Sequence, residues 1–300
     1  MQDDTRRGLY NTPKEIAEAV VFALPAILFL VCFLLIPIVG TFVSSFYRDV
    51  SYLPREFIFF ENFRRIATDS TYWRSVYFTV LFVACSVAIE MVIGIIFSLI
   101  MHEAFPGRGI LRGIILVPWA IPVAVSARVW ELIYNFHYGL ANYIVTALGI
   151  AGSPINWFGN SVGAFFALVI TDVWKTAPFV AIIILTGLQA IPEDLYAQAK
   201  VDGTQFMQRF WKITLPLLKP VIVVALLFRT IDALRVFDLV YVLTKGGPGG
   251  STTSVSLYAF KTFVAGDFGY GSAISVTLFI IAWLFSILYI KSSRFLEEVK

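Results

Sequence analysis

Six long apolar runs divide the chain, with polar stretches of varied length between them. A helix needs about 20 mostly apolar residues to cross a bilayer, and each run is close to or above that length. Prolines interrupt the first, third and fourth runs and predict kinks there, because neighbouring helices can satisfy the carbonyls that a proline frees. The pattern predicts an all-α polytopic membrane protein with six transmembrane helices. They are Val20–Phe46, Val76–Ile100, Gly113–Tyr134, Val162–Leu188, Leu217–Val242 and Ala273–Ile290.

The polar stretches give the expected order of segments. They are a tail at 1–19, a first helix at 20–46, an external loop at 47–75, a core of five helices at 76–290 containing a cytoplasmic loop at 191–216, and a tail at 291–300. Six spans place both termini on one side. Lys and Arg are more numerous on that side, so the positive-inside rule predicts a multi-pass protein of the plasma (inner) membrane with both termini cytoplasmic. The arginines of the first external loop count against this orientation, whereas the loop 135–160, which has no Lys or Arg, supports it.

Composition supports the membrane class. The 300 residues are 58% hydrophobic and 14% charged, whereas a soluble domain has about 25% charged residues. The net charge of +3 is too small to indicate a nucleic-acid partner. Cys32 and Cys85 lie in apolar runs, so we expect free thiols and no disulfide. The first apolar run is too long for a signal peptide and lacks a cleavage site, which predicts a retained span.

The stretch Ile191–Pro220 is the longest polar interruption in the second half of the chain. Pro192 suits the start of a helix, and two carboxylates follow it in the first turn, where they favour the helix dipole. This helix is expected to run through Leu195–Val201 and to stop at Gly203, since glycine commonly ends helices. The result is a short amphipathic helix on the predicted cytoplasmic side.

A second helix is expected to follow at Gln205–Ile213, capped by Thr204. Phe206 and Phe210 lie four residues apart, which gives this helix an apolar stripe. Pro216 is expected to end the helix and to begin the fifth span. The pattern alone leaves two interpretations equally open: a knob that docks on a partner protein, or an amphipathic pair lying on the lipid surface.

Several charged residues lie inside the predicted spans, where each costs about 2.5–3.5 kcal/mol. Asp172 and Lys175 are three residues apart in the fourth span and can pair across one turn. Glu90 stands alone in the second span, so it is either neutral or paired with a cation of another span. Near the outer end of the third span, Arg128 and Glu131 read as a structural pair. Such charges either face a cavity or brace the bundle.

A further ladder of charges occupies the fifth span. Arg229, Asp232, Arg235 and Asp238 alternate in sign at a spacing of three residues. Each step lags a full helical turn, so the ladder winds half-way round the helix and cannot all line one pore. For Arg235 and Asp238 we favour a static brace.

Aromatic rings and small polar side chains within the spans are candidates for contact with a ligand. Trp174 is a candidate ring, although helix packing is the somewhat better interpretation for it, and Ser275 belongs to a polar face of the sixth span. The full set of candidates for the translocation path is Glu90, Asp172, Trp174, Lys175, Arg229, Asp232 and Ser275.

The chain lacks the motifs of an independent energy source or an enzyme. It has no G-x-x-x-x-G-K-[ST] motif, so it has no phosphate-binding loop of that kind and energy must come from another subunit. The two histidines, His102 and His137, are expected on opposite sides of the membrane, which excludes a His-based metal site. We find no catalytic constellation and expect no cofactor bound by this chain.

The 191–216 loop resembles the cytoplasmic loop of ABC importer permeases. The family's Glu-Ala-Ala, three residues, Gly, nine residues, Ile-x-Leu-Pro matches Ala197-Gln198-Ala199, then Gly203, then Ile213-Thr214-Leu215-Pro216. The resemblance is closest to carbohydrate permeases of the maltose/trehalose kind and covers most of the chain from about residue 60. Other segments that carry it are Glu61–Phe63, Asp172–Phe179, Leu188–Pro192, Ala225–Thr230, Phe237–Asp238 and Thr244–Gly249.

The resemblance implies a type I ABC importer permease fold and a set of partners. These are a second homologous permease, two ATPase subunits that hold ATP and Mg, an extracytoplasmic sugar-binding protein, and membrane lipid. It implies a substrate such as trehalose or maltose. The loop residues that it implies for docking on the ATPase are Tyr196, Ala197, Gln198, Ala199, Asp202, Gly203, Phe206, Phe210, Ile213, Leu215 and Pro216.

The loop departs from the family pattern at its first two positions. Ala197 replaces the Glu that the family pairs with a basic residue of the ATPase, and Gln198 replaces the first Ala. Either this pair is missing here, or a carboxylate of Glu193, Asp194 or Asp202 replaces the family's Glu. Two alternatives to an ABC permease remain at this point: an ion-coupled carrier that uses Glu90 or Asp172, and a membrane scaffold or enzyme without a transport role.

Overall fold

The computed structural model describes residues 13–298, so parts of both predicted tails, 1–12 and 299–300, lie outside the described residues. The described chain is helical apart from one two-stranded hairpin. The first half comprises α1 (Pro13–Leu30), α2 (Ile36–Ser44), β1 (Tyr47–Arg48), β2 (Glu56–Phe57), α3 (Glu61–Thr68), α4 (Ser70–His102), α5 (Arg108–Ala120), α6 (Val123–Ile133) and α7 (Leu140–Ala147). The second half comprises α8 (Ser161–Gln189), α9 (Glu193–Val201), α10 (Phe206–Arg209), α11 (Leu215–Leu234), α12 (Asp238–Leu243), α13 (Val255–Val264) and α14 (Phe268–Glu298).

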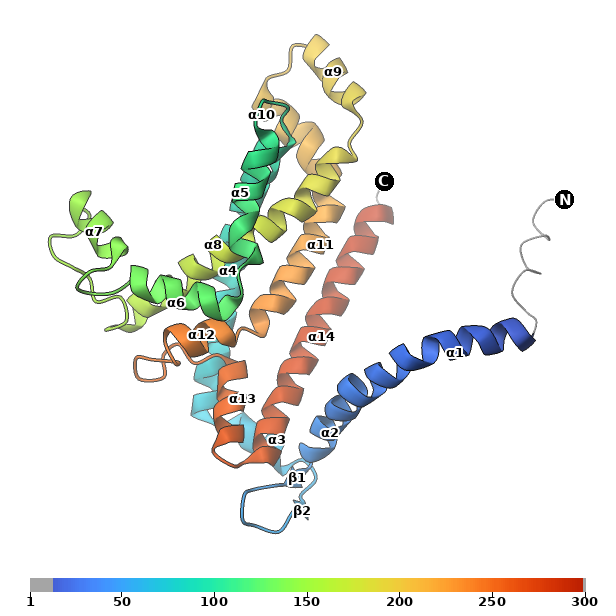
Figure 1. Cartoon of the computed structure of the whole chain (residues 1–300), viewed down its shortest axis with the longest axis vertical. Helices are drawn as coiled ribbons and strands as arrows, with labels where there is room; N and C mark the ends of the chain where they lie inside the picture. The colour runs from blue at the N-terminus through green and yellow to red at the C-terminus, as the bar shows by residue number, and fades with distance from the viewer. Residues whose placement is uncertain (1–12, 299–300) are drawn as a thin grey trace.

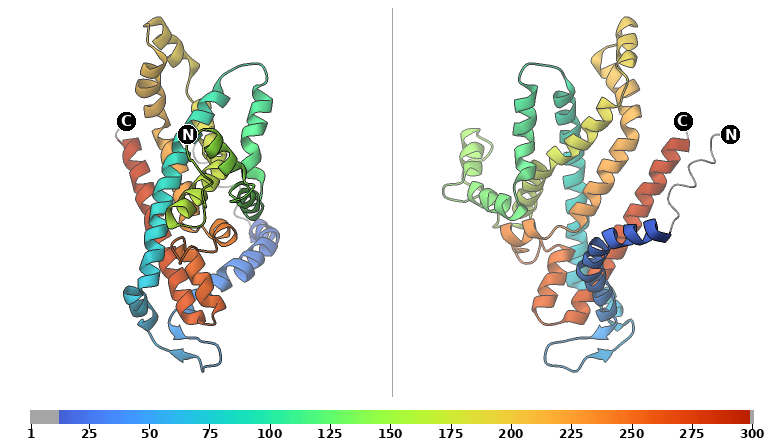
Figure 2. Two further views of the ribbon diagram at one scale, coloured as in Figure 1. Left: turned by 90° about the vertical axis from the view of Figure 1, so that its left-hand side faces the viewer. Right: turned by 45° about the vertical axis from the view of Figure 1, so that its right-hand side comes forward.

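The long helices α4, α8, α11 and α14 form the body, with α9 at one end and the β1–β2 hairpin at the other (Figures 1 and 2). The closest packing joins α4 to α8. Gly94 of α4 makes this possible, because a Cβ there would lie 2.5 Å from Cγ1 of Val180 on α8. The core around this contact includes the fully buried Phe82, Leu168 and Ile184.

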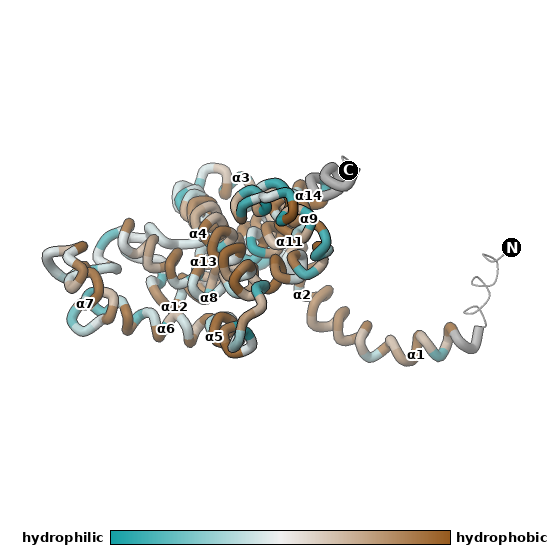
Figure 3. The backbone as a smooth tube through the Cα atoms, turned by 90° about the horizontal axis from the view of Figure 1, so that it is seen from above, coloured by the Kyte–Doolittle hydropathy of each residue, from teal (hydrophilic) through white to brown (hydrophobic). Residues whose placement is uncertain are grey.

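The N-terminal helix extends away from the body as a separate apolar rod (Figures 1 and 3). It joins α1 and α2 through a π-helical turn, Val31–Leu35, and none of its membrane-spanning window is buried within the chain. The turn lies just before Pro37. A straight α-helix would set the Pro37 ring against the carbonyl one turn earlier, and the wider π-turn relieves that clash. The end of α2 packs against α14, where the rings of Phe42 and Phe279 meet edge-on at 5.6 Å, and lipid or another chain must cover the rest of the rod.

The predicted spans agree with the structure in part. Four described helices are long and apolar enough to cross a membrane: Ile16–Ser44, Ser70–His102, Ser161–Gln189 and Phe268–Lys291. The pair α5 and α6 makes a fifth candidate if counted as one span. The count of six therefore remains a prediction. Cys32 and Cys85 are free thiols, as expected.

The third predicted span is wrong as a simple kinked helix, because α5 and α6 meet at an angle of 95°. Ile121 separates them in an extended conformation, which is what a residue before a proline prefers. Pro122 then precedes α6 without contributing an N–H. The fifth predicted span, Leu217–Val242, is also wrong at its end. The helix stops at Leu234, and α12 begins separately at Asp238.

Asp69 ties three helices together at the hairpin end of the body. Its Oδ1 accepts the backbone N–H of Thr71 and thereby caps α4. Its Oδ2 accepts the hydroxyls of Tyr258 on α13 at 2.5 Å and Tyr270 on α14 at 2.6 Å. Partial burial raises the pKa of this carboxyl, but the two tyrosine hydroxyls and the backbone N–H groups together lower it below its ordinary value. The folded state therefore favours the charged form.

Replacing Asp69 with Asn is expected to lower the thermal unfolding temperature at neutral pH and to reduce its dependence on acid. Because the folded-state pKa is depressed, the carboxylate's contribution is fully present above its ordinary value of 3.8 and is lost as the pH falls through the lower folded value. Thermal unfolding of the purified protein from pH 7 down to about pH 2, well below the ordinary carboxyl pKa, measures both effects. Glu61→Gln, at an exposed ion pair nearby, is the control. An acid dependence unchanged by Asp69→Asn would contradict the prediction.

Candidate functional site

The segment 191–216, here called the elbow, forms the end of the molecule opposite the hairpin (Figure 1). Helix α9 runs from Glu193 to Val201, with the two predicted carboxylates in its first turn. Gly203 has a φ of +72°, the left-handed conformation that glycine adopts at low cost. The predicted first helix and its glycine end are confirmed.

The predicted second helix of the elbow needs two corrections. Its N-cap is Gln205, whose side chain and that of Gln208 form a reciprocal capping box, while the hydroxyl of Thr204 donates to the carbonyl of Ala199 instead. The helix also does not end at Pro216. A π-helical turn, Phe210–Thr214, carries α10 directly into α11. As in the N-terminal rod, this wide turn lies just before the proline and relieves its clash with the preceding turn.

The elbow is braced internally and apolar on its surface. Tyr196 on α9 shares a hydrogen bond of 3.0 Å with Thr214 at the base of α11. Ala199 is buried, whereas Val201, Phe206 and Trp211 are exposed by 88%, 57% and 60%. The other residues expected to dock are exposed at Ala197, Gln198, Asp202 and Gly203 and partly buried at Phe210, Ile213, Leu215 and Pro216. This is a stiff structure with an apolar face that the described chain does not cover.

The carboxylates proposed to replace the family's Glu all lie on the elbow surface. Glu193, Asp194 and Asp202 are exposed, and none forms an ion pair within the part of the chain that the structure describes. They are therefore open to a partner.

Arg229 on α11 is the centre of a buried ion cluster. Its guanidinium donates to Glu90 on α4 at 2.5 and 3.0 Å, to Asp172 on α8 at 3.2 Å, and to Asp232 one turn along α11 at 2.6 Å. The side chains of Arg229 and Glu90 are 2% and 0% exposed. The structure thus brings together four of the predicted translocation-path residues, from three helices. Of the two alternatives for Glu90, pairing with a cation of another span is confirmed.

Lys175 does not join this cluster, and the pair with Asp172 that the spacing allowed is not formed. Asp172 faces Arg229, while the Lys175 ammonium donates to the backbone carbonyls of Trp119 at 3.1 Å and Ile121 at 2.7 Å. Spacing along a helix identified a possible partner, but carbonyls of another helix provide the contacts that the ammonium makes.

A pocket of about 420 Å³ opens beside the ion cluster. One wall is aromatic: Trp119 of α5 stacks on Phe179 of α8 with ring centroids 5.8 Å apart, and Phe179 meets the ring of Phe228 on α11 edge-on at 6.4 Å. The rest of the lining includes the charged side chains of Arg229 and Asp232. The pocket is lined by Trp119, Thr176, Phe179, Phe228, Arg229, Ile231, Asp232 and Arg235.

Thr176 and the three rings of this pocket were not among the predicted site residues. Thr176 donates to Glu90 at 2.7 Å and lies one turn after Asp172, and Phe179 lies one turn after Lys175. Helical periodicity could therefore have placed both beside known candidates. No local signal pointed to Trp119 or Phe228, since their position depends on how α5 and α11 pack against α8.

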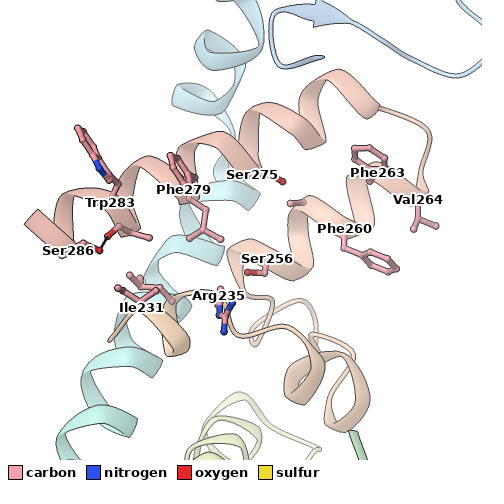
Figure 4. Close-up of a pocket in the computed structure, with 14 residues that line it drawn as sticks. Ile231, Arg235, Ser256, Phe260, Phe263, Val264, Ser275, Phe279, Trp283 and Ser286 are labelled. Carbon is pink, nitrogen blue, oxygen red and sulfur yellow. Dashed lines mark hydrogen bonds between the residues drawn. The ribbon is translucent and has the colours of Figure 1, made fainter. Parts of the chain in front are cut away.

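Two predicted path residues lie elsewhere. The ring of Trp174 meets that of Trp130 on α6 edge-on at 5.6 Å, which agrees with the helix-packing interpretation. Ser275 lines a second pocket of about 670 Å³ between α11, α13 and α14, drawn in Figure 4. This pocket is mainly apolar, with Phe260, Phe279 and Trp283 in its wall. Ile231 and Arg235 border both pockets, so the two are neighbours.

The charge ladder of the fifth span is broken, because α11 ends before its last members. Arg235 follows the end of α11, is exposed, and pairs with Asp232 at 3.0 Å. Asp238 begins α12 and forms no ion pair within the described residues. Arg235 thus pairs with a neighbour on its own segment, and the static brace favoured for Arg235 and Asp238 stays a prediction. The predicted pair of Arg128 and Glu131 is confirmed at 2.6 Å.

The long apolar helices with a buried ion cluster between them define an integral membrane protein. Comparison with known proteins gives the family. Residues 90–297 match the family described as binding-protein-dependent transport system inner membrane component, and the chain belongs to it.

Individual relatives agree with this assignment. The chain is 51% identical to a trehalose/maltose transport system permease of Thermococcus litoralis over 92% of its own length and 93% of the relative's. It is 37% identical to a trehalose transport system permease of Mycobacterium tuberculosis, covering 87% and 85% of the two chains. With a sulfoquinovosyl glycerol transport system permease of Agrobacterium fabrum the identity is 38%, over 92% and 90%. The chain is thus a permease subunit of a binding-protein-dependent importer and not an enzyme.

Solved structures support the fold. The chain superposes on a subunit of a bacterial ABC transporter involved in the import of the acidic polysaccharide alginate, with a TM-score of 0.82 over 94% of this chain and 96% of the other. The identity of 22% makes this a likeness of fold. The predicted ABC importer permease fold is confirmed.

Proposed function

We propose that this chain forms half of the translocation pathway of an ATP-driven sugar importer, with a disaccharide or oligosaccharide such as trehalose or maltose as its substrate. The observation that carries the proposal is the pocket in which Trp119, Phe179 and Phe228 face Arg229 and Asp232. Aromatic rings stack on the apolar faces of sugar rings, and charged groups bind hydroxyls. The names of the 51% and 37% identical relatives support the same substrate class.

The proposed assembly contains a second, homologous permease, two ATPase subunits and an extracytoplasmic sugar-binding protein, embedded in membrane lipid. The exposed apolar face of the elbow, with Val201 and Phe206, is a fitting surface for an ATPase. In this arrangement the elbow and both termini are cytoplasmic, and ATP and Mg are held by the ATPases.

Force is proposed to pass from the ATPases to the bundle through the elbow as a rigid body. Two features support this: the hydrogen bond between Tyr196 and Thr214, and the unbroken course from α10 into α11. Since α11 also carries Arg229, a displacement of the elbow acts directly on the helix that joins the ion cluster and the pocket. Docking uses the elbow residues from Tyr196 to Pro216.

The test is to purify the complete complex and to measure its ATPase activity with the binding protein and with trehalose or maltose. We expect at least one of these sugars to stimulate hydrolysis. An ion-coupled carrier would instead give uptake that persists without ATP and collapses with an ion gradient. A scaffold would purify as a stable chain without ATPase partners. Either result would overturn the proposal.

A further inference from the structure

We propose that Lys175 is a positioning residue that holds the break between α5 and α6 and thereby sets the aromatic wall of the sugar pocket, without itself touching the sugar. This inference rests on the proposed function for the identity of the ligand. Its structural part, the bracing of the break, does not.

The Lys175 ammonium lies in an environment that penalises a charge. The Lys175 side chain belongs to a residue that is only 8% exposed, inside a helix that can span the membrane. A cation there is costly and persists only where something compensates it. Within the described residues no carboxylate lies within 4.0 Å of this nitrogen, and the compensation comes from the carbonyls of Trp119 and Ile121.

The place of these two carbonyls in the chain explains why they accept from a cation. They come from the end of α5, where the last carbonyls of a helix have no partner within the helix and the helix dipole is negative. Here the chain turns by 95° and continues with Pro122, which offers no N–H. A positive donor from α8 both satisfies these carbonyls and favours the dipole. Lys175 thus acts as a cap supplied by another helix.

Trp119 links the Lys175 cap to the pocket. Lys175 and Phe179 lie one turn apart on α8, and both contact Trp119: the lysine binds its carbonyl, and the phenylalanine stacks on its ring. Trp119 is thereby held at its backbone and its side chain by one face of α8. If the lysine contact is lost, the backbone of Trp119 is no longer fixed, and its ring no longer keeps one position against Phe179.

The decisive variants are Lys175→Met, which keeps the length of the side chain and removes the donor, and Lys175→Arg, which keeps a cationic donor. Binding of radiolabelled trehalose and maltose is measured on the complex of permeases and ATPases without the extracytoplasmic binding protein, whose own sugar site would otherwise dominate the signal. We expect Lys175→Met to weaken binding about tenfold, the scale of losing a charge-assisted hydrogen bond, and Lys175→Arg to restore most of it. Arg128→Met, at an exposed pair on α6, is the matched control.

A double-mutant cycle with Trp119→Ala separates positioning from direct contact with the sugar. If Lys175 acts through Trp119, adding Lys175→Met to Trp119→Ala weakens binding no further. Independent, multiplying losses would overturn the inference. Should the methionine variant fail to assemble, Lys175→Gln, which retains an uncharged donor, replaces it in the cycle.

A second measurement does not depend on the sugar. Spin labels at the exposed Ile114 on α5 and Val129 on α6 report the geometry of the break. We expect a broader distance distribution in Lys175→Met than in the wild type and a wild-type distribution in Lys175→Arg. Equal distributions in all three would refute the bracing role. If the wild-type complex binds neither sugar while the distances change as expected, the proposed substrate fails and the bracing stands.

Discussion

Replacing Arg229 with Met is expected to prevent the chain from assembling into a stable complex. The guanidinium is the shared partner of Glu90, Asp172 and Asp232, and without it two carboxylates from different helices face each other in a site with almost no solvent. Removing one partner of a buried ion pair costs about 3–5 kcal/mol. That is a large part of the roughly 5–15 kcal/mol by which a folded domain is stable.

Lysine is not an adequate substitute at this position. Arg229 reaches Glu90 through both Nε and Nη2 and has a further nitrogen for Asp232. The planar guanidinium can serve several carboxylates at once, whereas an ammonium is a single point charge on a flexible stem. We expect Arg229→Lys to be intermediate. The double variant Glu90→Gln with Arg229→Met should recover part of the loss, because it removes a negative charge together with the positive one.

The measurements are the yield of the assembled complex and its thermal unfolding temperature. The matched control is Arg235→Met on the same segment. The Arg235 side chain is 73% exposed, and among the described residues its one ion-pair partner is Asp232. We therefore expect the stability to change by about 0–1 kcal/mol, the usual contribution of an exposed ion pair. If the variants at 229 and 235 gave equal yields of complex and equal unfolding temperatures, the buried cluster would not stabilise the structure.

The contrast between these two arginines shows what sequence reasoning could reach. Both lie in the same alternating ladder, and of the pairs three residues apart the one between Arg128 and Glu131 was foreseen. The pattern could not separate the buried arginine from the exposed one. That difference arises because α4 and α8 bring Glu90 and Asp172 against one face of α11, and because α11 ends at Leu234.

The break between α5 and α6 illustrates the same limit for backbone geometry. Pro118 and Pro122 predicted a distortion, and the extended residue before Pro122 follows from local sterics. The angle of 95° does not. It is accompanied by a lysine that lies 54 residues away from Ile121 in the sequence, and no property of either segment alone reveals that contact. The apolar runs and the prolines therefore predicted where the helices lie and where they are interrupted. The angle at an interruption depends on packing against other helices.

The elbow marks where local rules sufficed and where they failed. The α9 helix and the left-handed Gly203 follow from residues within one or two turns, and both are observed. The prediction that the second elbow helix ends at Pro216 was wrong. A π-helical turn, which has no simple sequence signature, allows the proline to lie within a continuous helix. This continuity matters for function, since a rigid connection carries a displacement from the elbow to α11 and a flexible joint would not.

Replacing Gly203 with Val is expected to uncouple ATP hydrolysis from uptake. Gly203 is exposed at a φ of +72°, and a Cβ there would meet nothing within 4 Å. The substitution therefore causes no collision, and its whole effect is backbone strain, about 1–2 kcal/mol or more for a β-branched residue. The chain relieves this strain by changing the turn between α9 and α10. The complex should remain assembled and hydrolyse ATP, while the elbow no longer transmits the motion.

Two controls distinguish this outcome from general damage. Gly149 has a similar φ of +67°, and a Cβ there also meets nothing within 4 Å. It lies in the loop after α7, far from the elbow (Figure 1). Gly149→Val should therefore bear comparable strain and keep uptake coupled to hydrolysis. Gly203→Asn should be milder than Gly203→Val, because Asn tolerates the left-handed region. The readout is the ratio of sugar taken up to ATP hydrolysed in proteoliposomes containing the complete complex. A wild-type ratio in Gly203→Val, or an equal fall in Gly149→Val, would show that the conformation at Gly203 has no special part in coupling.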